Sequence, residues 1–518
     1  MILQTSDLPW WQTPTAKALF AGVILTLSFP PLPLGFLGYI GLIPFFYALE
    51  QTDGEHGFRL GYIAGLVYTG GMIYWIGANS GTFPWAAILS AIMAVAFMAL
   101  NFGLFGWALG WIKRKEVSGG LWWAPVLWVA VEFLRSFGTL VMPWVSLSLS
   151  QTDYLPAIQM AGITGMYGVS FWVVLLNVVI IRYLMAKDVG KPTWKWAIVA
   201  FAIYLIPLGY GTVILRVLPG VTEESKPVKV SVLQPNVDPN QKWSSQFRRE
   251  NYALLDSLTS VVTAQEPDIA IWPETATPSY LRYNRYGYLT KLRKKVNSTG
   301  IPLLTGTPDW RPPDSVTQGD DGSIYNAAVL IEQGSENLQT YRKVKLVPFA
   351  EYVPYQRIFG FFYKLDLGQG NYTPGEKYTV FNLNEPVRTK FSVAICYDSS
   401  FPELLRRFRQ GGAEWQAIIT NDAWFGNTSG PYQHAEWAKM RAVEYRTPIA
   451  RSANTGISML IDGWGRVRQS LPLNSQGTLT GTLETNLRPT FYAKFGDVFS
   501  IIITLIAIGG IGWGFAKQ

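Results

Sequence analysis

The stretch Val393-Ala394-Ile395-Cys396-Tyr397-Asp398 is an apolar run that ends in the only cysteine of the chain. In α/β proteins the reactive side chains commonly lie where a strand meets a loop, so this position favours a nucleophile. The alternative is that Cys396 is a buried residue that packs as a small hydrophobe. The run itself predicts a strand, and we work outward from it.

Short β-branched runs like this one alternate with polar helical stretches over residues 228–496. The expected strands are Val228–Gln234, Ile269–Trp272, Leu303–Thr307, Ala327–Glu332, Phe391–Cys396, Ala417–Thr420 and Gly456–Ile461. The expected helices are Asn251–Thr263, Tyr288–Asn297, Pro402–Gln410 and Gln433–Arg446. Strands interleaved with helices predict a layered α/β fold, and the segment is long enough for a full core.

The remainder of the 518-residue chain is markedly apolar. Residues 1–216 hold 11 Lys/Arg and 8 Asp/Glu, whereas residues 217–496 hold 31 and 26. We expect a seven-span membrane domain at 1–216, a linker at 217–227, an α/β catalytic domain at 228–496 and an eighth span at 497–518. The candidate spans are 16–32, 35–49, 60–79, 85–112, 121–138, 168–185, 196–216 and 498–515.

Composition also excludes several classes of protein. Hydrophobic residues make up 49% of the chain and charged residues 15%, which excludes a disordered protein and a coiled coil. One Cys and two His exclude a disulfide scaffold and most zinc sites, so we expect no metal and no other cofactor. The net charge of +8 is weak support for nucleic acid, and we expect no nucleic-acid partner.

The basic residues between the spans predict the orientation of the chain. They all fall on one side of the membrane if the N-terminus is cytoplasmic. Both termini are then cytoplasmic, and residues 217–496 lie outside the cytoplasm. The residues that carry this prediction are Arg59, Lys113, Arg114, Lys115, Arg182, Lys187, Lys191, Lys195 and Lys517.

Two features of the apolar part have more than one interpretation. Residues 140–166 are apolar but contain Pro143, Asp153 and Pro156, so we expect an interfacial or re-entrant segment. Glu132 and Arg135 are either a functional intramembrane pair or an i,i+3 ion pair close to the interface.

Three further segments of the α/β part carry groups that suit catalysis. Ile271-Trp272-Pro273-Glu274 puts a carboxylate at a strand tip. Residues 341–354 hold a basic stretch before a Pro-bounded loop, with Lys343 and Glu351 in it. Residues 420–426 predict a structured turn, and His434 follows on a helix. His434 is the sole imidazole available to Cys396 as a base, and a carboxylate base is the alternative.

Taken together, these segments resemble the nitrilase superfamily, whose pattern is Glu, Lys and Cys in that chain order. With the membrane spans added, the chain resembles the bacterial apolipoprotein N-acyltransferase family. The resemblance rests on the contexts of Glu274, Lys343 and Cys396, and on further stretches. These are residues 132–135, 167–171, 346–354, 421–426 and 440–444.

The resemblance implies an α-β-β-α sandwich and acyl transfer in the bacterial inner membrane, with the catalytic domain on the periplasmic side. Cys396 would be the nucleophile, Glu274 the general base and Lys343 the oxyanion stabiliser, helped by the backbone N–H of Tyr397. The donor would be a membrane phospholipid, and the acceptor the α-amino group of a diacylglyceryl-modified apolipoprotein. It also implies supporting roles for Glu351, Asp398, Asn326 and Glu444, and a lipid contact for Trp243.

Two positions depart from the family pattern. Ala350 stands where the family usually has Gly, and Asp398 stands where many members have Glu. Two rival functions stay open at this point. One is a membrane-tethered nitrilase-like amidase that hydrolyses its thioester with water. The other is a transporter or receptor whose outer domain only binds a ligand.

Overall fold

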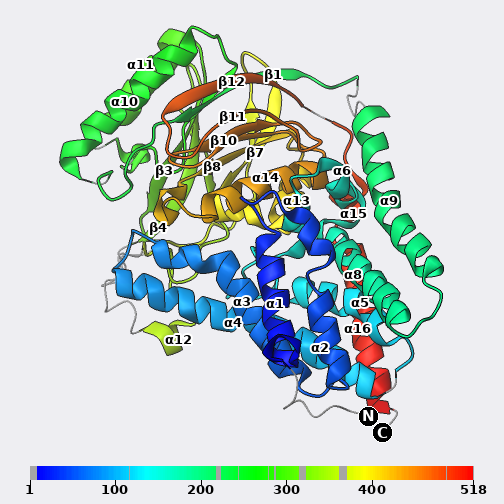
Figure 1. The fold of residues 1–518 in the computed structure, drawn as a ribbon. Coiled ribbons are helices and arrows are strands. Elements are labelled where there is room, and N and C mark those ends of the chain that lie inside the picture. Colours follow the sequence, from blue (N-terminus) through cyan, green and yellow to red (C-terminus); the bar gives the residue numbers. More distant parts are fainter. Residues whose placement is uncertain are drawn as a thin grey trace. The chain divides into compact units, whose positions relative to one another are not determined.

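The computed structural model describes residues 9–115, 117–217, 223–242, 244–277, 279–284, 287–313, 322–360, 370–485 and 487–516. Close packing divides the chain into two units. One comprises residues 1–77, 87–218 and 495–518, and the other comprises 78–86 and 219–494. The first is helical and the second is α/β (Figure 1).

The helical unit is built from apolar helices of unequal length. The main helices are α1 (Pro14–Leu27), α2 (Ile43–Gln51), α3 (Gly57–Ile73), α4 (Pro84–Arg114), α5 (Ala124–Leu134), α8 (Met166–Asp188), α9 (Trp194–Val217) and α16 (Val498–Ala516). The shorter ones are η2 (Trp10–Gln12), η3 (Gly35–Tyr39), η4 (Tyr74–Ala78), η5 (Gly120–Trp123), η6 (Leu147–Gln151), α6 (Leu155–Ile158) and α7 (Ala161–Thr164).

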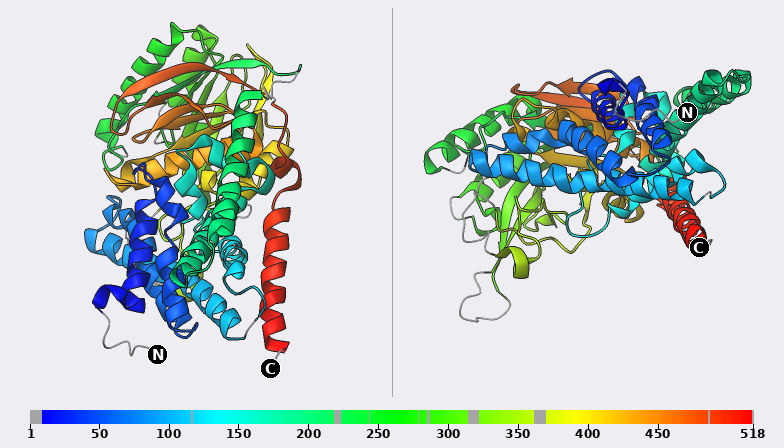
Figure 2. Two further views of the ribbon diagram at one scale, coloured as in Figure 1. Left: turned by 45° about the vertical axis from the view of Figure 1, so that its right-hand side comes forward. Right: turned by 60° about the horizontal axis from the view of Figure 1, so that its bottom comes forward.

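Within the described residues, four of these helices are long and apolar enough to cross a membrane: 84–114, 166–188, 194–216 and 498–516. Each coincides with a predicted span, and Figure 2 shows the last, α16, as one straight helix. The other four predicted spans appear as shorter or interrupted helices. Pro30 and Pro31 follow α1, and residues 35–51 divide into η3 and α2, so neither stretch forms one long helix. The number of crossings therefore stays a prediction.

Small residues allow the close approach of α3 and α4. Gly57, Gly61 and Gly65 recur every four residues on α3. A Cβ on Gly61 would lie 2.4 Å from the carbonyl oxygen of Phe102 on α4, so only glycine fits there. Small residues at this spacing are typical of helix packing in membranes.

Glu132 and Arg135 form an i,i+3 ion pair of 3.8 Å at the end of α5. The Glu132 carboxylate also accepts the backbone N–H of Leu147 at 2.8 Å and the indole N–H of Trp128 at 3.0 Å. These bonds fasten the segment after α5, which contains η6, α6 and α7 and no long helix. The pair thus has a packing role in the helical unit.

The α/β unit consists of two six-stranded sheets in the orders β12-β1-β2-β3-β4-β5 and β11-β10-β9-β8-β7-β6. The strands of the first sheet are β1 (Pro227–Gln234), β2 (Ile269–Ile271), β3 (Leu303–Arg311), β4 (Ser323–Ile331), β5 (Gln339–Arg342) and β12 (Gly477–Glu484). Those of the second are β6 (Val380–Leu383), β7 (Thr389–Ile395), β8 (Trp415–Thr420), β9 (Ile449–Ala453), β10 (Ser458–Ile461) and β11 (Val467–Leu471).

Helices cover the outer face of each sheet, which gives four layers (Figure 1). The helices that follow the linker, before α16, are α10 (Ser245–Thr263), α11 (Tyr288–Thr299), α12 (Gln356–Phe359), α13 (Pro402–Gln410), α14 (Gly430–Tyr445) and α15 (Phe491–Phe495), with η7 (Leu281–Tyr283), η9 (Cys396–Ser400) and η10 (Asp422–Phe425). The α10 and α11 pair packs on the first sheet around Trp272, Leu255 and Val296, and α13 and α14 pack on the second. The predicted α-β-β-α sandwich is confirmed.

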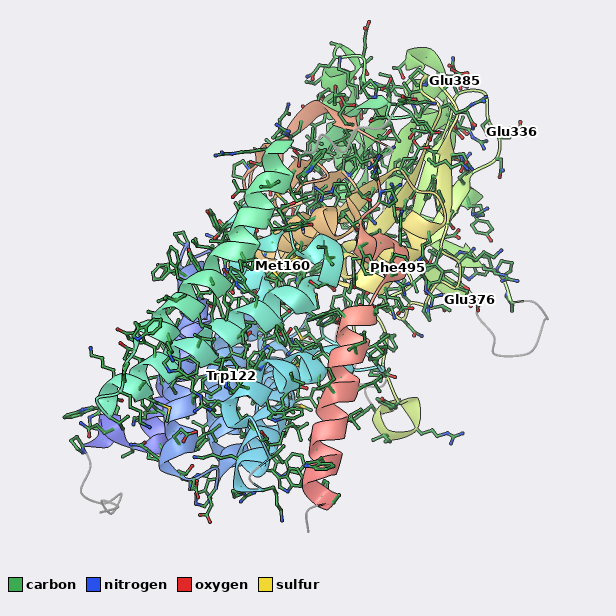
Figure 3. All side chains as sticks on the ribbon, turned by 90° about the vertical axis from the view of Figure 1, so that its right-hand side faces the viewer. Trp122, Met160, Glu336, Glu376, Glu385 and Phe495 are labelled. Atoms are coloured by element: carbon green, nitrogen blue, oxygen red, sulfur yellow. The ribbon has the colours of Figure 1, made fainter. Side chains whose placement is uncertain are left out.

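The composition of the two units differs as the charge pattern predicts. Figure 3 labels Trp122 and Met160 among the helices of the helical unit, and Glu336, Glu376 and Glu385 on the α/β unit. β1 pairs in parallel with β2, and β2 with β3; in the other sheet β7 pairs in parallel with β8, and β8 with β9. This brings the carboxyl ends of neighbouring strands to one edge of each sheet. Glu274 and Cys396 follow β2 and β7 at such edges.

Candidate active site

Cys396 begins η9 directly after β7 and has a left-handed backbone, with φ +50°. A residue other than glycine in this region is uncommon and often marks a functional turn. The residue is partly exposed. Burial of its surroundings and the nearby charge of Glu274 raise the pKa of the thiol, whereas Lys343 acts in the opposite direction. The thiol is therefore protonated at neutral pH and needs a base.

Glu274 follows β2 and is 6% exposed. Burial raises the pKa of its carboxyl group above the ordinary value, while the ammonium of Lys343 opposes the rise. Its Oε1 accepts a hydrogen bond from Asn326 Nδ2 at 2.7 Å and lies 3.8 Å from Lys343 Nζ. A carboxylate with a raised pKa is a stronger base than a solvated one, which suits proton transfer.

Lys343 follows β5 and is 1% exposed. Its Nζ donates to Glu351 Oε1 at 2.8 Å. Burial alone would lower the pKa of Lys343, but the charges of Glu351, Cys396 and Glu274 raise it above the ordinary value. The side chain is thus a permanent cation inside the site.

Glu351 and Asn326 connect these groups. Asn326, from β4, donates its Nδ2 to Glu274 at 2.7 Å and to Glu351 at 3.2 Å. The second oxygen of Glu351 accepts the backbone N–H of Val347 at 2.8 Å. Two carboxylates, one amide and one ammonium therefore form a single bonded cluster.

Asp398 is completely buried beside Cys396, and its side chain supports the turn. It accepts the hydroxyl of Tyr341 at 2.9 Å and the backbone N–H groups of Lys345 at 2.8 Å and Ile395 at 3.2 Å. Burial raises the pKa of Asp398 to about 6, although Lys343 and these donors oppose the rise.

His434 lies on α14, and its ring contacts the backbone of the turn that begins at Cys396. Its Nδ1 donates to Asp422 Oδ1 at 2.7 Å, and Nε2 lies 3.2 Å from the carbonyl oxygen of Cys396 and 3.0 Å from Ser399 Oγ. Asp422 is in turn paired with Arg451 at 2.8 Å. Burial would raise the pKa of Asp422, but Arg451 and His434 hold it well below its usual range. The imidazole is thus bonded to oxygens, which favours a carboxylate as the base for the thiol.

Cys396, Asp422 and His434 could each offer one ligand atom to a metal ion, and these atoms lie within 4.8 Å of one another. The buried guanidinium of Arg451 already neutralises the Asp422 carboxylate. A metal ion bound to the same carboxylate would be repelled by that guanidinium, so these three residues fit a metal site poorly.

Comparison with known proteins gives the family. Residues 21–179 match the family described as the apolipoprotein N-acyltransferase N-terminal domain, and residues 229–490 match the carbon-nitrogen hydrolase family. The apolipoprotein N-acyltransferase of Geobacter metallireducens is 33% identical to this chain over 93% of it and 92% of the relative. This chain belongs to the apolipoprotein N-acyltransferase family. The same enzyme of Chlorobaculum tepidum is 31% identical over 93% of this chain and 92% of that relative.

Among solved structures, Nit3 of Saccharomyces cerevisiae, described as a member of branch 10 of the nitrilase superfamily, is 19% identical. It covers 52% of this chain and 92% of its own, with a TM-score of 0.38.

The structure brings together most of the residues that the sequence predicts for the site. Glu274, Lys343, Glu351 and Asn326 share one cluster, and the charges of Glu274 and Lys343 act on Cys396. Tyr397 is buried beside Cys396, with its ring 5.0 Å from that of Phe401.

Two other predicted residues stand apart. Glu444 is fully buried on α14, where it pairs with Arg441 at 2.7 Å, and its backbone carbonyl accepts the hydroxyl of Thr490. These bonds indicate that Glu444 helps to pack α14. Trp243 lies outside the described residues, so its lipid contact stays a prediction.

Sequence reasoning missed Lys242 and Arg451 as parts of the site. Arg451 lies in the middle of β9, where a buried guanidinium is unexpected. Lys242 lies in a polar loop whose composition predicts an exposed surface segment, yet its side chain is only 4% exposed. Neither residue carries a signal in the sequence, because each is defined by a partner from a distant segment.

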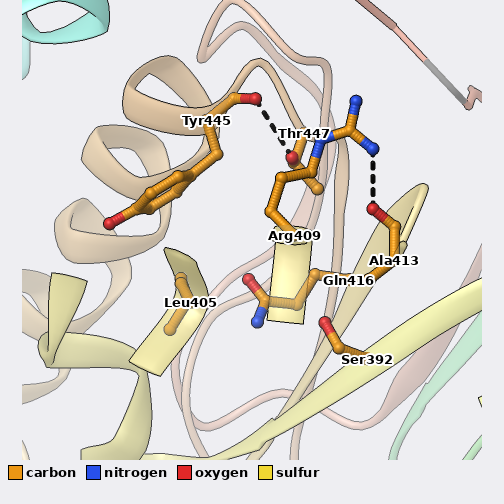
Figure 4. Close-up of a pocket in the computed structure, with 7 residues that line it drawn as sticks. All are labelled: Ser392, Leu405, Arg409, Ala413, Gln416, Tyr445 and Thr447. Carbon is orange, nitrogen blue, oxygen red and sulfur yellow. Dashed lines mark hydrogen bonds between the residues drawn. The ribbon is translucent and has the colours of Figure 1, made fainter. Parts of the chain in front are cut away.

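A small cavity elsewhere in the α/β unit contains none of the proposed catalytic groups (Figure 4). Arg409 donates there to the carbonyl oxygen of Ala413 at 2.7 Å. Gln416 Nε2 has no hydrogen-bond partner among the described residues, which suits an ordered water. The lining residues are Ser392, Leu405, Arg409, Ala413, Gln416, Tyr445 and Thr447.

Proposed function

We propose that this protein transfers a fatty acyl chain from a membrane phospholipid to the α-amino group of the N-terminal diacylglyceryl-cysteine of apolipoproteins. The observation that carries the proposal is the pairing of Lys343 with both Glu274 and Glu351, beside a thiol with a raised pKa. Membership of the apolipoprotein N-acyltransferase family supports the nature of the two substrates.

In the first half-reaction, Glu274 removes the proton from Cys396, and the thiolate attacks the ester carbonyl of the phospholipid. The oxyanion forms beside the ammonium of Lys343 and the backbone N–H of Tyr397. When the tetrahedral intermediate collapses, the C–O bond breaks and Glu274 returns its proton to the leaving glycerol oxygen. A lysophospholipid departs, and the acyl chain stays on Cys396 as a thioester.

In the second half-reaction, the neutral α-amine of the acceptor attacks the thioester carbonyl. Glu274 accepts the amine proton, the C–S bond breaks, and the proton passes to the departing Cys396 thiolate, which restores the thiol and the Glu274 carboxylate. An α-amino pKa near ~7.7–8 leaves enough neutral amine at physiological pH. Residues of this chain therefore supply the nucleophile, the base and the oxyanion stabilisers that both steps need.

Localisation in the bacterial inner membrane is part of the same proposal. The basic loops favour cytoplasmic termini and a periplasmic α/β unit. A site at the outer leaflet would meet the acyl ester without moving lipid into water. Reporter fusions test this: a C-terminal green fluorescent protein should fluoresce, and an alkaline phosphatase inserted in the exposed turn at Asn474 should be active. The reverse pattern would contradict the orientation.

Hydrolysis by a nitrilase-like amidase is the second candidate, because residues 229–490 match the carbon-nitrogen hydrolase family. The experiment mixes the purified protein with phospholipid vesicles and a diacylglyceryl-cysteine peptide. Transfer predicts an N-acylated peptide and one equivalent of lysophospholipid, with little free fatty acid. Free fatty acid formed at the same rate with and without peptide would favour hydrolysis instead.

A further inference from the structure

The side-chain amine of Lys242 is buried, and its hydrogen-bond partners are neutral. Its side chain is 4% exposed, and Nζ donates to the carbonyl oxygen of Glu274 at 3.0 Å and to Thr275 Oγ1 at 2.8 Å. Within the described part of the chain, no carboxylate lies within ion-pairing distance of this Nζ. A buried charge without a counter-ion is costly, so its retention calls for a reason.

The turn that Lys242 contacts is strained. Thr275 has φ +45°, a left-handed conformation that is a genuine outlier for a β-branched residue. Such conformations persist only where surrounding groups hold them, and they cluster at active sites. Lys242 bonds the residue that carries the strain and the residue directly before it.

Strand β3 packs closely against the same turn. A Cβ on Gly306 would lie 2.5 Å from the backbone nitrogen of Thr275 and 2.7 Å from the Cα of Glu274. The carbonyl oxygen of Gly306 also accepts the backbone N–H of Thr277 at 3.1 Å. The turn is thus held by contacts with the β3 backbone and by the hydrogen bonds of Lys242.

The direction of the Glu274 side chain follows from this backbone. Its carboxylate points to Asn326 and Lys343, while its own carbonyl oxygen faces Lys242. If the turn relaxed, the carboxylate would move away from both partners. A displacement of about 1 Å of a catalytic group can cost about 10²-fold in rate.

We infer that Lys242 is a positioning residue for the general base: its side-chain amine holds the strained Glu274–Thr275 turn and so aims the Glu274 carboxylate. The inference rests on the proposed role of Glu274 in acyl transfer. Burial lowers the pKa of Lys242 to about 7, and the charge of Glu274 opposes that shift. The two groups therefore also interact through their charges.

The test measures the rate of Cys396 acylation by phospholipid in a single turnover, by intact mass, in the full chain. Lys242→Met should slow acylation about 10²-fold. The melting temperature should stay within a few degrees, and the phospholipid concentration for half-maximal rate should be unchanged. Lys390→Met, at an exposed lysine on β7, is the matched control and should acylate at the wild-type rate.

A double variant separates positioning from a general structural role. If Lys242 acts through Glu274, Lys242→Met adds no further loss to Glu274→Gln. Multiplied losses in the double variant, or wild-type acylation by Lys242→Met alone, would overturn the inference. Wild-type acylation by Glu274→Gln would instead overturn the proposed base, so the two failures are distinct.

Substitution of Thr275, which accepts a hydrogen bond from Lys242, gives a second test if Lys242→Met does not fold. Thr275→Ser keeps the hydroxyl that accepts from Lys242, whereas Thr275→Val keeps the shape and removes it. The inference predicts near wild-type acylation for Thr275→Ser and a loss of about tenfold for Thr275→Val, the cost of one hydrogen bond to a charged group. Equal rates for the two variants would contradict it.

Discussion

The hydroxyl of Tyr341 donates to Asp398 Oδ2 at 2.9 Å, and this bond joins the strand before Lys343 to the turn that holds Cys396. The same carboxylate accepts the backbone N–H of Lys345. The nucleophile and the cation therefore depend on one buried acid for their spacing. Where many family members have Glu, the shorter Asp398 already reaches all three of its donors in this chain.

Substitution of Asp398 tests this connection. Asp398→Asn should slow acylation of Cys396 by about 10²-fold, because an amide N–H would face buried backbone donors. Tyr341→Phe removes one bond and should cost less than about tenfold. Single-turnover acylation and melting temperature measure both effects. A larger loss for Tyr341→Phe than for Asp398→Asn would contradict the account.

Substitution of Glu351 tests how the cation is held. Glu351→Gln keeps the shape but removes the charge that Lys343 Nζ contacts at 2.8 Å. We expect acylation to fall by ~10²–10³, the usual cost of a lost oxyanion stabiliser, since the ammonium would be misplaced. Glu403→Gln, at an exposed ion pair on α13, is the control and should have no effect. Equal rates for Glu351→Gln and the control would rule out this role of Glu351.

The two bases considered for the thiol predict opposite orders of activity. If Glu274 is the base, Glu274→Gln should leave only slow residual acylation, measurable over a long incubation. His434→Asn should then lose about tenfold to a hundredfold through a looser turn, since its ring contacts the Cys396 carbonyl oxygen. Intact-mass time courses compare the two variants. Greater residual acylation in Glu274→Gln than in His434→Asn would favour the imidazole.

The pH dependence should differ between the half-reactions. Both steps need Glu274 ionised, and the pKa of this carboxyl group is raised by burial, so both rates rise with pH. Asp398, whose pKa is about 6, loses acceptor capacity when protonated, so acylation should fall as the pH drops through about 6. Full turnover should fall already below about pH 8, because the acceptor amine becomes protonated. Rate profiles with and without the peptide acceptor check this. Identical profiles would contradict the two-step account.

Much of the α/β fold follows from the sequence because its central strands are continuous apolar runs. Residues 391–396 and 417–420 were predicted as strands and correspond to β7 and β8. Several other strands escaped prediction for physical reasons. β11 is largely exposed and polar, and β12 contains two glycines, so neither has a buried apolar pattern. β9 carries Arg451, whose burial depends on Asp422.

The sequence predicts a site residue only where the residue type itself indicates a chemical role. A lone Cys, a Glu at a strand tip and a Lys in a distinctive context could be found. Their order along the chain indicated that they belong to one site. Lys242 could not be found, since its burial and its bonds to Glu274 and Thr275 arise from tertiary packing. The helical unit shows the same limit: apolar length predicted spans, but prolines and interruptions shortened several of the helices.

The central claim is that the acyl chain passes through Cys396, and one measurement tests it most directly. Purified wild-type protein and Cys396→Ala are incubated with phospholipid and no acceptor, and their intact masses are recorded. We predict that the wild type gains one fatty acyl group, that Cys396→Ala gains none, and that a diacylglyceryl-cysteine peptide removes the adduct. An N-acylated peptide made at the normal rate by Cys396→Ala would contradict the account.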